Sequence, residues 1–249
     1  MTTAVAPEGA LLRIDALTKS FGGFVALDNV SVAIRKGERF GLIGPNGSGK
    51  TTLVNCISGV LRPNKGAVLF ADEDITPLPP NQRAHRGIAR SFQIPRPFRS
   101  MTVLENLMVA LDFAPGHKLL ESVSHRRDAA MSILTRMGLA SKAYEATATL
   151  TQVELRKMEL ARAMATGPKL LISDEAMAGL STSEVDEVLD LLMSLGGEDV
   201  AIIMIEHIMQ AVMRFSERMM CLDAGRIIAL GKPADVMANA RVQEAYLGT

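Results

Sequence analysis

One stretch of the chain has the residue types and spacing of a phosphate-binding loop. An apolar run at 40–43 precedes it and predicts a buried strand, and apolar residues return at helical spacing over 52–57. Glycines let backbone N–H groups approach phosphate oxygens, and the following helix N-terminus favours an anion. We expect the phosphates of a nucleotide to be bound by Gly44, Pro45, Asn46, Gly47, Ser48, Gly49, Lys50, Thr51 and Thr52. Among these, Lys50 would contact the β- and γ-phosphates, and the Thr51 hydroxyl would bind Mg²⁺.

Two acidic residues follow a second apolar run. Residues 170–173 are mostly apolar, so Asp174 is expected at the carboxyl end of a buried strand, where ligands bind in open α/β sheets. Asp174 would hold Mg²⁺ directly or through water, and Glu175 would polarise an attacking water. The alternative is an ordinary acidic turn after a strand, and the phosphate loop upstream argues against it.

Two further polar residues are predicted at strand ends. Gln93 would end a strand over 88–93 and bridge the metal and the attacking water. His207 follows an apolar strand at 200–205 and would contact the γ-phosphate. For a lone histidine, a packed or solvated imidazole is the alternative.

Composition limits the function classes. The chain has 249 residues, enough for one large domain or a domain plus a subdomain. Lys plus Arg and Asp plus Glu both number 27, so no basic excess points to nucleic acid. No apolar run approaches the ~18 residues that span a bilayer.

Cys56 and Cys221 lie far apart without metal-ligand spacing, which fits a reduced, cytoplasmic setting. The 15 methionines would either fill the core or line a docking surface.

The amino-terminal part is predicted to be rich in strands. Alternating apolar residues indicate strands at 11–17 and 25–34, and a short strand at 67–70. The middle stretch, 93–149, is mostly helical in pattern. Its first helix follows Thr102, which forms a capping box with Glu105. Further helices are predicted at 122–137 and 140–146.

Helices and strands alternate in the last third of the chain. This pattern predicts a parallel sheet covered on both faces. The predicted strands are 170–175, 200–205, and the pair 217–223 and 226–230 around Ala224-Gly225. The predicted helices are 151–165, one that ends at Leu195, and short helices to the end. For the helix that ends at Leu195, Ser183 is the predicted N-cap, with Asp186 near its third position.

Together these motifs resemble the ATP-binding subunit of an ABC transporter over nearly the whole chain. Gly44–Thr51 stands as the Walker A motif, and Leu170–Glu175 resembles Walker B with its catalytic glutamate. The other matches are Gln93 with the Q-loop, Ala178-Gly179-Leu180-Ser181 with the D-loop, His207 with the switch histidine, and Phe21 with the aromatic residue that stacks on adenine.

The resemblance implies an α/β fold, that of a P-loop NTPase of the ABC type. Its mixed sheet core would carry an antiparallel β subdomain and an inserted helical subdomain. Residues 1–249 would form a single ABC ATPase domain. Residues 1–92 and 168–249 would make the ATP-binding core with the β subdomain, and about 93–167 the Q-loop and helical subdomain.

Some segments narrow the resemblance to importers of branched-chain amino acids. These are Arg90-Ser91-Phe92-Gln93, Arg96-Pro97-Phe98, Met101–Asn106, Ile205-Glu206-His207 and Glu244–Gly248. Related ATPases for urea, other amides or lipopolysaccharide share parts of this pattern. The implied function is hydrolysis of ATP with Mg²⁺, which powers import of branched-chain or other amino acids. The implied partners are a second ATPase subunit, in a homo- or heterodimer, permease subunits at the cytoplasmic face of the inner membrane, and indirectly a periplasmic or extracellular substrate-binding protein.

The signature motif departs from the family pattern. Leu150-Thr151-Gln152-Val153-Glu154 stands where the family has LSGGQ, so Thr151, Val153 and Glu154 would face the ATP bound by the partner. A β-branched residue in place of the second glycine would obstruct the backbone and disfavour a positive φ. Ala176 also replaces a usual proline.

The weakened signature leaves a second function open. This is an ATP-dependent dimer clamp or regulatory ABC subunit with little hydrolysis. Intact Glu175 and His207 argue against the clamp. An ABC ATPase acting on DNA or ribosomes is disfavoured, because the chain has no coiled-coil arms, tandem cassettes or basic excess.

Overall fold

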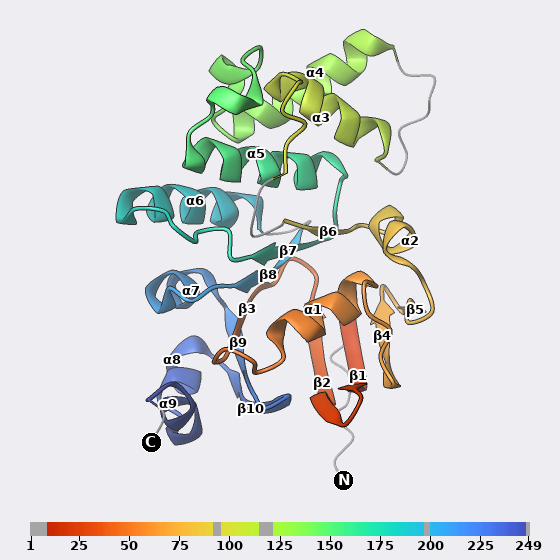
Figure 1. Ribbon diagram of the computed structural model, residues 1–249, viewed down its shortest axis with the longest axis vertical. Coiled ribbons are helices and arrows are strands. Elements are labelled where there is room, and N and C mark those ends of the chain that lie inside the picture. The colour runs from red at the N-terminus through yellow and green to blue at the C-terminus, as the bar shows by residue number, and fades with distance from the viewer. Residues whose placement is uncertain (1–8, 92–95, 115–121, 197–199, 248–249) are drawn as a thin grey trace.

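The computed structural model describes residues 9–91, 96–114, 122–196 and 200–247. Two sheets organise these residues (Figure 1). One sheet has four antiparallel strands in the order β2-β1-β4-β5, and the other has six strands in the order β10-β9-β3-β8-β7-β6. Both the mixed sheet and the antiparallel sheet expected from the sequence are therefore present.

The antiparallel sheet is formed by the amino-terminal part of the chain. Its strands are β1 (Ala10–Phe21), β2 (Phe24–Arg35), β4 (Lys65–Phe70) and β5 (Glu73–Asp74). The turn between β1 and β2 contains Gly22, whose φ of 57° is in the left-handed region that favours glycine. Because β1 and β2 are long and pair along their whole length, this turn lies at one end of the sheet, beside the phosphate loop.

The six-stranded sheet carries the predicted site residues. Five strands are parallel: β3 (Arg39–Ile43), β6 (Ile88–Arg90), β7 (Leu170–Asp174), β8 (Ala201–Ile205) and β9 (Arg218–Asp223). The last strand, β10 (Arg226–Gly231), pairs antiparallel with β9, as the Ala224-Gly225 hairpin predicted. Since parallel strands end at the same edge, the segments that follow β3, β7 and β8 gather there.

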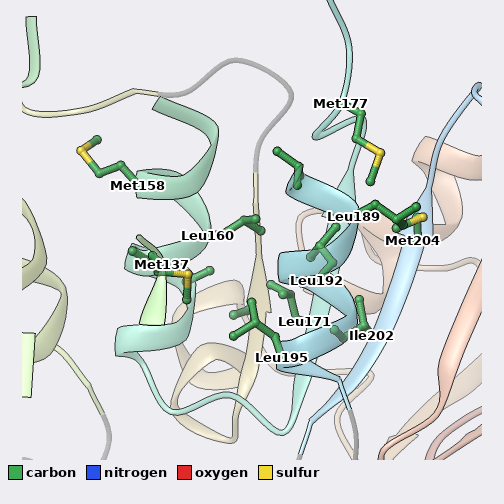
Figure 2. Packing of buried hydrophobic residues seen from close by; sticks show 14 of the residues in the cluster. Met137, Met158, Leu160, Leu171, Met177, Leu189, Leu192, Leu195, Ile202 and Met204 are labelled. Atoms are coloured by element: carbon green, nitrogen blue, oxygen red, sulfur yellow. The ribbon is translucent and has the colours of Figure 1, made fainter. Parts of the chain in front are cut away.

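Each face of this sheet has its own hydrophobic core. Successive residues of a strand point to opposite faces, so Leu171 and Ile202 join one core while Ile172 and Ile203 join the other. Figure 2 shows leucines of α6 beside Ile202 and Met204 of β8, with Leu160 of α5 in the same cluster. Both faces of the sheet are therefore covered, as the alternating pattern predicted.

Helices cover the two faces unequally. On one side, α1 (Lys50–Ser58) packs between the two sheets, with α2 (Pro80–His85) next to it. On the other side lie α5 (Gln152–Ala165), α6 (Thr182–Leu195) and α7 (Met209–Phe215). In Figure 1, α3 (Val103–Asp112) and α4 (Val123–Arg136) lie beyond α5, at the end of the molecule farthest from the antiparallel sheet. The chain closes with α8 (Pro233–Met237) and α9 (Ala240–Leu247) beside β9 and β10. None of the described helices has the length and apolar character needed to cross a membrane.

Most predicted helix starts are confirmed, and one is wrong. Thr102 and Glu105 form the expected capping box of α3. The N-cap of α6 is Ser181, not Ser183, and its backbone N–H donates to the Glu184 carboxylate at 2.8 Å. Glu184 stands three residues after Ser181 and completes this box. Asp186 has the same spacing from Ser183, but its side chain is shorter by one methylene, and the capping box favours Glu or Gln at that position.

Other differences concern short elements. The strand predicted over 88–93 ends at Arg90, and the predicted helix at 140–146 is a single 3₁₀ turn over Ala140–Lys142. Helix α2 was not predicted, because its polar residues carry no apolar period. The methionines mainly fill the two cores. Met137, Met158, Met177, Met204 and Met219 are buried in one core and Met220 in the other, and six further methionines pack, partly buried, against the first core. Core filling is thus the better of the two explanations offered for them.

Candidate nucleotide-binding site

The loop after β3 can be built only with glycine at two positions. Gly44 has a φ of 149°, and a Cβ there would lie 2.2 Å from the Leu222 carbonyl oxygen. Gly49 has a φ of 106°, and a Cβ there would lie 2.7 Å from the Ala26 carbonyl oxygen. The loop is therefore pressed against its neighbours on one side, and it leads directly into α1, which begins at Lys50.

Lys50 lies folded over the loop. Its ammonium donates to the carbonyls of Gly44 and Pro45 at 2.7 and 3.0 Å. Burial lowers its pKa, and the nearby carboxylates of Glu175 and Asp174 act in the opposite direction. The Ser48 hydroxyl is buried and has no hydrogen-bond partner within the described part of the chain. An ammonium group and an unsatisfied hydroxyl at a helix N-terminus are suited to phosphate oxygens.

A cleft of about 290 Å³ opens beside the loop. Residues 46–52 and Phe21 line it, as predicted, and Glu175 and His207 close it on another side. Gly44 and Pro45 are not in the lining; instead their carbonyls hold Lys50. Thus predicted nucleotide-binding and catalytic residues, from four separate parts of the sequence, surround one space.

Two aromatic rings flank the outer end of the cleft. Phe21 ends β1 and Phe24 begins β2, so they stand on either side of the hairpin turn. The Lys19 ammonium lies 5.0 Å from the centroid of the Phe21 ring, and Phe24 is 64% exposed. Phe24 and Ala26 also line the cleft and were not predicted from the sequence. A pair of phenylalanines around Gly22-Gly23 was the available signal for the former.

Glu175 and His207 are paired across the ends of adjacent strands. The His207 Nε2 and Glu175 Oε1 atoms are 3.1 Å apart. Glu175 has a φ of 49°, in the left-handed region that costs a non-glycine residue energy, and its N–H donates to the Ile205 carbonyl at 2.9 Å. The strained backbone thereby turns the carboxylate toward the histidine and the cleft.

Asp174 lies behind the cleft rather than in its lining. Arg90 donates to Asp174 Oδ2 at 2.6 Å and to Asn55 Oδ1 at 2.7 Å. This ion pair joins β6, β7 and α1 and fixes the carboxylate at the edge of the sheet. An ion bound by Asp174 would therefore have to share it with Arg90.

A buried acid adjoins this group. Glu206 is 3% exposed, and its Oε1 accepts from the Met177 N–H at 2.8 Å. Burial raises the pKa of Glu206 to about 7. The bond links the end of β8 to the turn that follows Glu175. An acid directly before His207 was visible in the sequence, but nothing there showed that it is buried.

The signature segment lies away from the cleft of its own chain. Thr151 caps α5 in a capping box with Glu154, and neither they nor Val153 line the cleft. Val153 stands in the first helical turn and has no positive φ, which agrees with the expectation that a β-branched residue disfavours that conformation. Its side chain packs partly buried against the core. Gln93 lies outside the described residues.

Comparison with known proteins identifies the family. The family model described as "ABC transporter" matches residues 27–178, and one described as "Branched-chain amino acid ATP-binding cassette transporter" matches residues 226–249. The chain is 39% identical over 249 residues to the high-affinity branched-chain amino acid transport ATP-binding protein LivG of Escherichia coli, covering 96% of this chain and 98% of that protein. It is 37% identical over 246 residues to the probable LivG protein of Archaeoglobus fulgidus, covering 96% of this chain and 95% of that protein.

Solved structures agree with this result. The crystal structure of the ADP conformation of an ATP-binding cassette of an ABC transporter matches with a TM-score of 0.88 and 32% identity, over 96% of this chain and 99% of that one. A dimeric post-hydrolysis cassette bound to ADP and Pi matches with a TM-score of 0.79 and 26% identity, over 89% of this chain and 98% of that one. The resemblance seen in the sequence is confirmed: the chain belongs to the ABC transporter family, as one of its ATP-hydrolysing, ATP-binding subunits.

Proposed function

We propose that this ATPase powers import of branched-chain or other amino acids through a membrane transporter. One observation carries the catalytic part of the proposal: a single cleft holds the buried Lys50 on one side and the Glu175–His207 pair on another. The transported class follows from the relatives, whose names specify branched-chain amino acid transport.

Each group of residues in the cleft has a separate role in the proposed hydrolysis of ATP. Backbone N–H groups of 46–52 and the Lys50 ammonium would bind the phosphates of ATP. Glu175 would orient and polarise the attacking water, and His207 would contact the γ-phosphate while holding the carboxylate in place. Phe21, with Phe24 beside it, would stack on the adenine ring.

Mg²⁺ is the implied metal. The Thr51 hydroxyl and Asp174 offer the hard oxygen ligands that Mg²⁺ prefers, and Gln93 would add another. Mg²⁺ is usually held by one or two protein groups together with water and substrate phosphates, so these few oxygens would suffice. When bound, Mg²⁺ neutralises charge on the β- and γ-phosphate oxygens.

The proposed partners follow from the signature segment. A relative of the same fold is dimeric with ADP and Pi, and we propose that this chain pairs likewise with a second ATPase subunit. Thr151, Val153 and Glu154 would then face the ATP of the partner, at an α5 N-terminus that favours an anion.

We propose a location at the cytoplasmic face of the inner membrane, with permease subunits and, indirectly, a substrate-binding protein. In the proposed division, about 93–167 forms the Q-loop and helical subdomain, and 1–92 with 168–249 the ATP-binding core.

Val153 supports a second candidate, a dimer clamp with little hydrolysis. Its branched side chain occupies the first turn of α5, where the family's glycine leaves the backbone open. The Glu175–His207 pair opposes this candidate, because a clamp that does not hydrolyse ATP has no use for it.

The test is ATP turnover by the protein alone and together with the proposed second ATPase subunit and permease. Glu175→Gln should lower turnover about 10²- to 10⁴-fold, the usual contribution of a general base, and leave ATP binding intact. Glu217→Gln, an exposed acid away from the cleft, is the control. Val153→Gly should raise the rate. If ATP binds but its hydrolysis does not depend on Glu175 with any partner, the dimer clamp is the correct function.

A further inference from the structure

The carboxyl-terminal helix touches the phosphate loop. Tyr246 of α9 accepts a hydrogen bond from the Gly44 backbone N–H, with 2.7 Å between the nitrogen and Oη. The two residues are 202 positions apart in sequence. In Figure 1, α8 and α9 lie at the end of the molecule beside β9 and β10, where the chain ends.

The Gly44 N–H has a specific need for this acceptor. The pairing of β3 with β9 ends at Ile43, which lies opposite Cys221. Gly44 therefore stands one residue past the sheet. Its backbone is buried and so close to Leu222 that no Cβ would fit. A buried N–H requires a hydrogen-bond partner, and the Tyr246 hydroxyl supplies it. Tyr246 is 40% exposed overall, but burial at its hydroxyl raises its pKa to about 12, so the phenol stays neutral at physiological pH.

The same glycine also holds the loop lysine. The Gly44 carbonyl accepts from the Lys50 ammonium at 2.7 Å. Gly44 is thus fixed on both sides, by Tyr246 through its N–H and by Lys50 through its C=O. A shift of Gly44 would move the start of the loop and the anchor of Lys50 together.

We propose that Tyr246 is a positioning residue for nucleotide binding. It holds Gly44 where the loop and Lys50 can receive phosphates, and so couples the carboxyl-terminal helix to the occupancy of the site. The inference rests on the nucleotide site proposed above. Because such coupling is reciprocal, we expect a bound nucleotide in turn to favour the arrangement in which the Tyr246 hydroxyl holds Gly44, and so to alter the surroundings of Tyr246.

A purely structural role predicts a different result. If the hydroxyl only satisfies a buried N–H, its removal lowers stability and leaves the affinity of the folded protein unchanged. If it positions the loop, the binding-competent arrangement becomes less populated and the apparent dissociation constant rises. Affinity and stability therefore separate the two roles.

The first experiment compares Tyr246→Phe with wild type by titration with Mg-ADP and Mg-ATP. The variant keeps the ring and loses the hydroxyl. We expect nucleotide to bind about three- to tenfold more weakly, the effect of one net hydrogen bond, with kcat at saturating ATP changed less than KM. Tyr144→Phe is a matched control, since it alters the other of the two tyrosines, which is 65% exposed. If wild type and Tyr246→Phe bind nucleotide with equal affinity, with or without loss of thermal stability, this inference is wrong. The proposed function would still stand.

A second measurement leaves Tyr246 unchanged and does not depend on the folding of the first variant. The chain has no tryptophan and two tyrosines, so Tyr144→Phe leaves Tyr246 as the sole tyrosine emitter. Its fluorescence should change on titration with Mg-ADP, with the same dissociation constant that a direct binding measurement gives. A Tyr246 signal that stays constant while ADP binds would refute the coupling. If wild-type protein bound no nucleotide, the proposed site and this inference would both be wrong.

Discussion

Glu206 shows how a single buried acid can make stability depend on pH. Glu206 is 3% exposed and directly follows β8, and burial raises the pKa of its carboxyl group to about 7. Below about pH 4.5 the group is protonated in both the folded and the unfolded protein. As pH rises from there to about 7, the unfolded chain loses this proton first, so the folded state becomes relatively less stable. Above pH 7 the full penalty is present, on the order of 3 kcal/mol.

The Glu206→Gln variant tests this at the residue scale. Glutamine keeps a carbonyl oxygen for the Met177 N–H and does not ionise. The free energy of unfolding should therefore lose its decline between about pH 4.5 and 7, and at pH 8 it should exceed that of wild type by up to about 3 kcal/mol. Urea unfolding at several pH values measures this. Glu217→Gln, at an exposed site, should keep the wild-type profile; a decline that survives in Glu206→Gln would assign it to other groups.

At the scale of elements, α2 secures the far end of the phosphate-binding helix. Arg83 of α2 is 1% exposed and donates to the carbonyls of Cys56 and Ile57, in the last turn of α1, at 2.6 and 2.8 Å. It also donates to the carbonyls of Leu78 and Thr76. The last carbonyls of a helix have no partner within it, and a cation there also suits the helix dipole. The helix whose first residue is Lys50 is thus anchored at its other end by an arginine.

Replacing Arg83 should be costly for this reason. In Arg83→Met four carbonyls lose a charged donor, and we expect the free energy of unfolding to fall by about 3 kcal/mol or more. Arg86→Met is the matched control three residues farther along, because Arg86 pairs with Glu73 at the surface and its loss should leave stability nearly unchanged. Equal urea midpoints for the two variants would contradict the anchoring role of Arg83.

At the scale of the whole molecule, the nucleotide site lies where separate layers meet. Its lining comes from the antiparallel sheet, the loop before α1 and the ends of β7 and β8. A ligand bound there contacts both the amino-terminal and carboxyl-terminal parts of the chain, so it should stabilise the fold as one unit.

This predicts a measurable thermal shift. At a Mg-ADP concentration 100-fold above Kd, binding to the folded state should add about 2.7 kcal/mol to the free energy of unfolding. Lys50→Ala should lose most of this increase, because its ammonium is the proposed charge on the phosphates. Scanning calorimetry with and without ligand measures both. The same shift in wild type and Lys50→Ala would show that the stabilising site lies elsewhere.

Local patterns were sufficient to predict most of the elements and the core of the site. The phosphate loop, the strand before Asp174 and the capping box of Thr102 depend on residues within a few positions of one another, so their spacing is visible in the sequence. The family resemblance added the link between motifs far apart in the chain. Prediction failed where the signal was weak, as at α2 with its polar residues, or where two caps competed, as at Ser181 and Ser183.

Only the tertiary structure decided which distant side chains meet. The sequence by itself determined the loop from Gly44 to Thr51 and the helix that follows it, because glycine spacing and apolar period are local properties. It could not show that Arg90 pairs with Asp174, 84 positions away, or that Tyr246 reaches Gly44, 202 positions away. Those contacts exist because the order of strands in the sheet and the return of the chain to β9 and β10 bring the partners together, and no short-range pattern encodes that order.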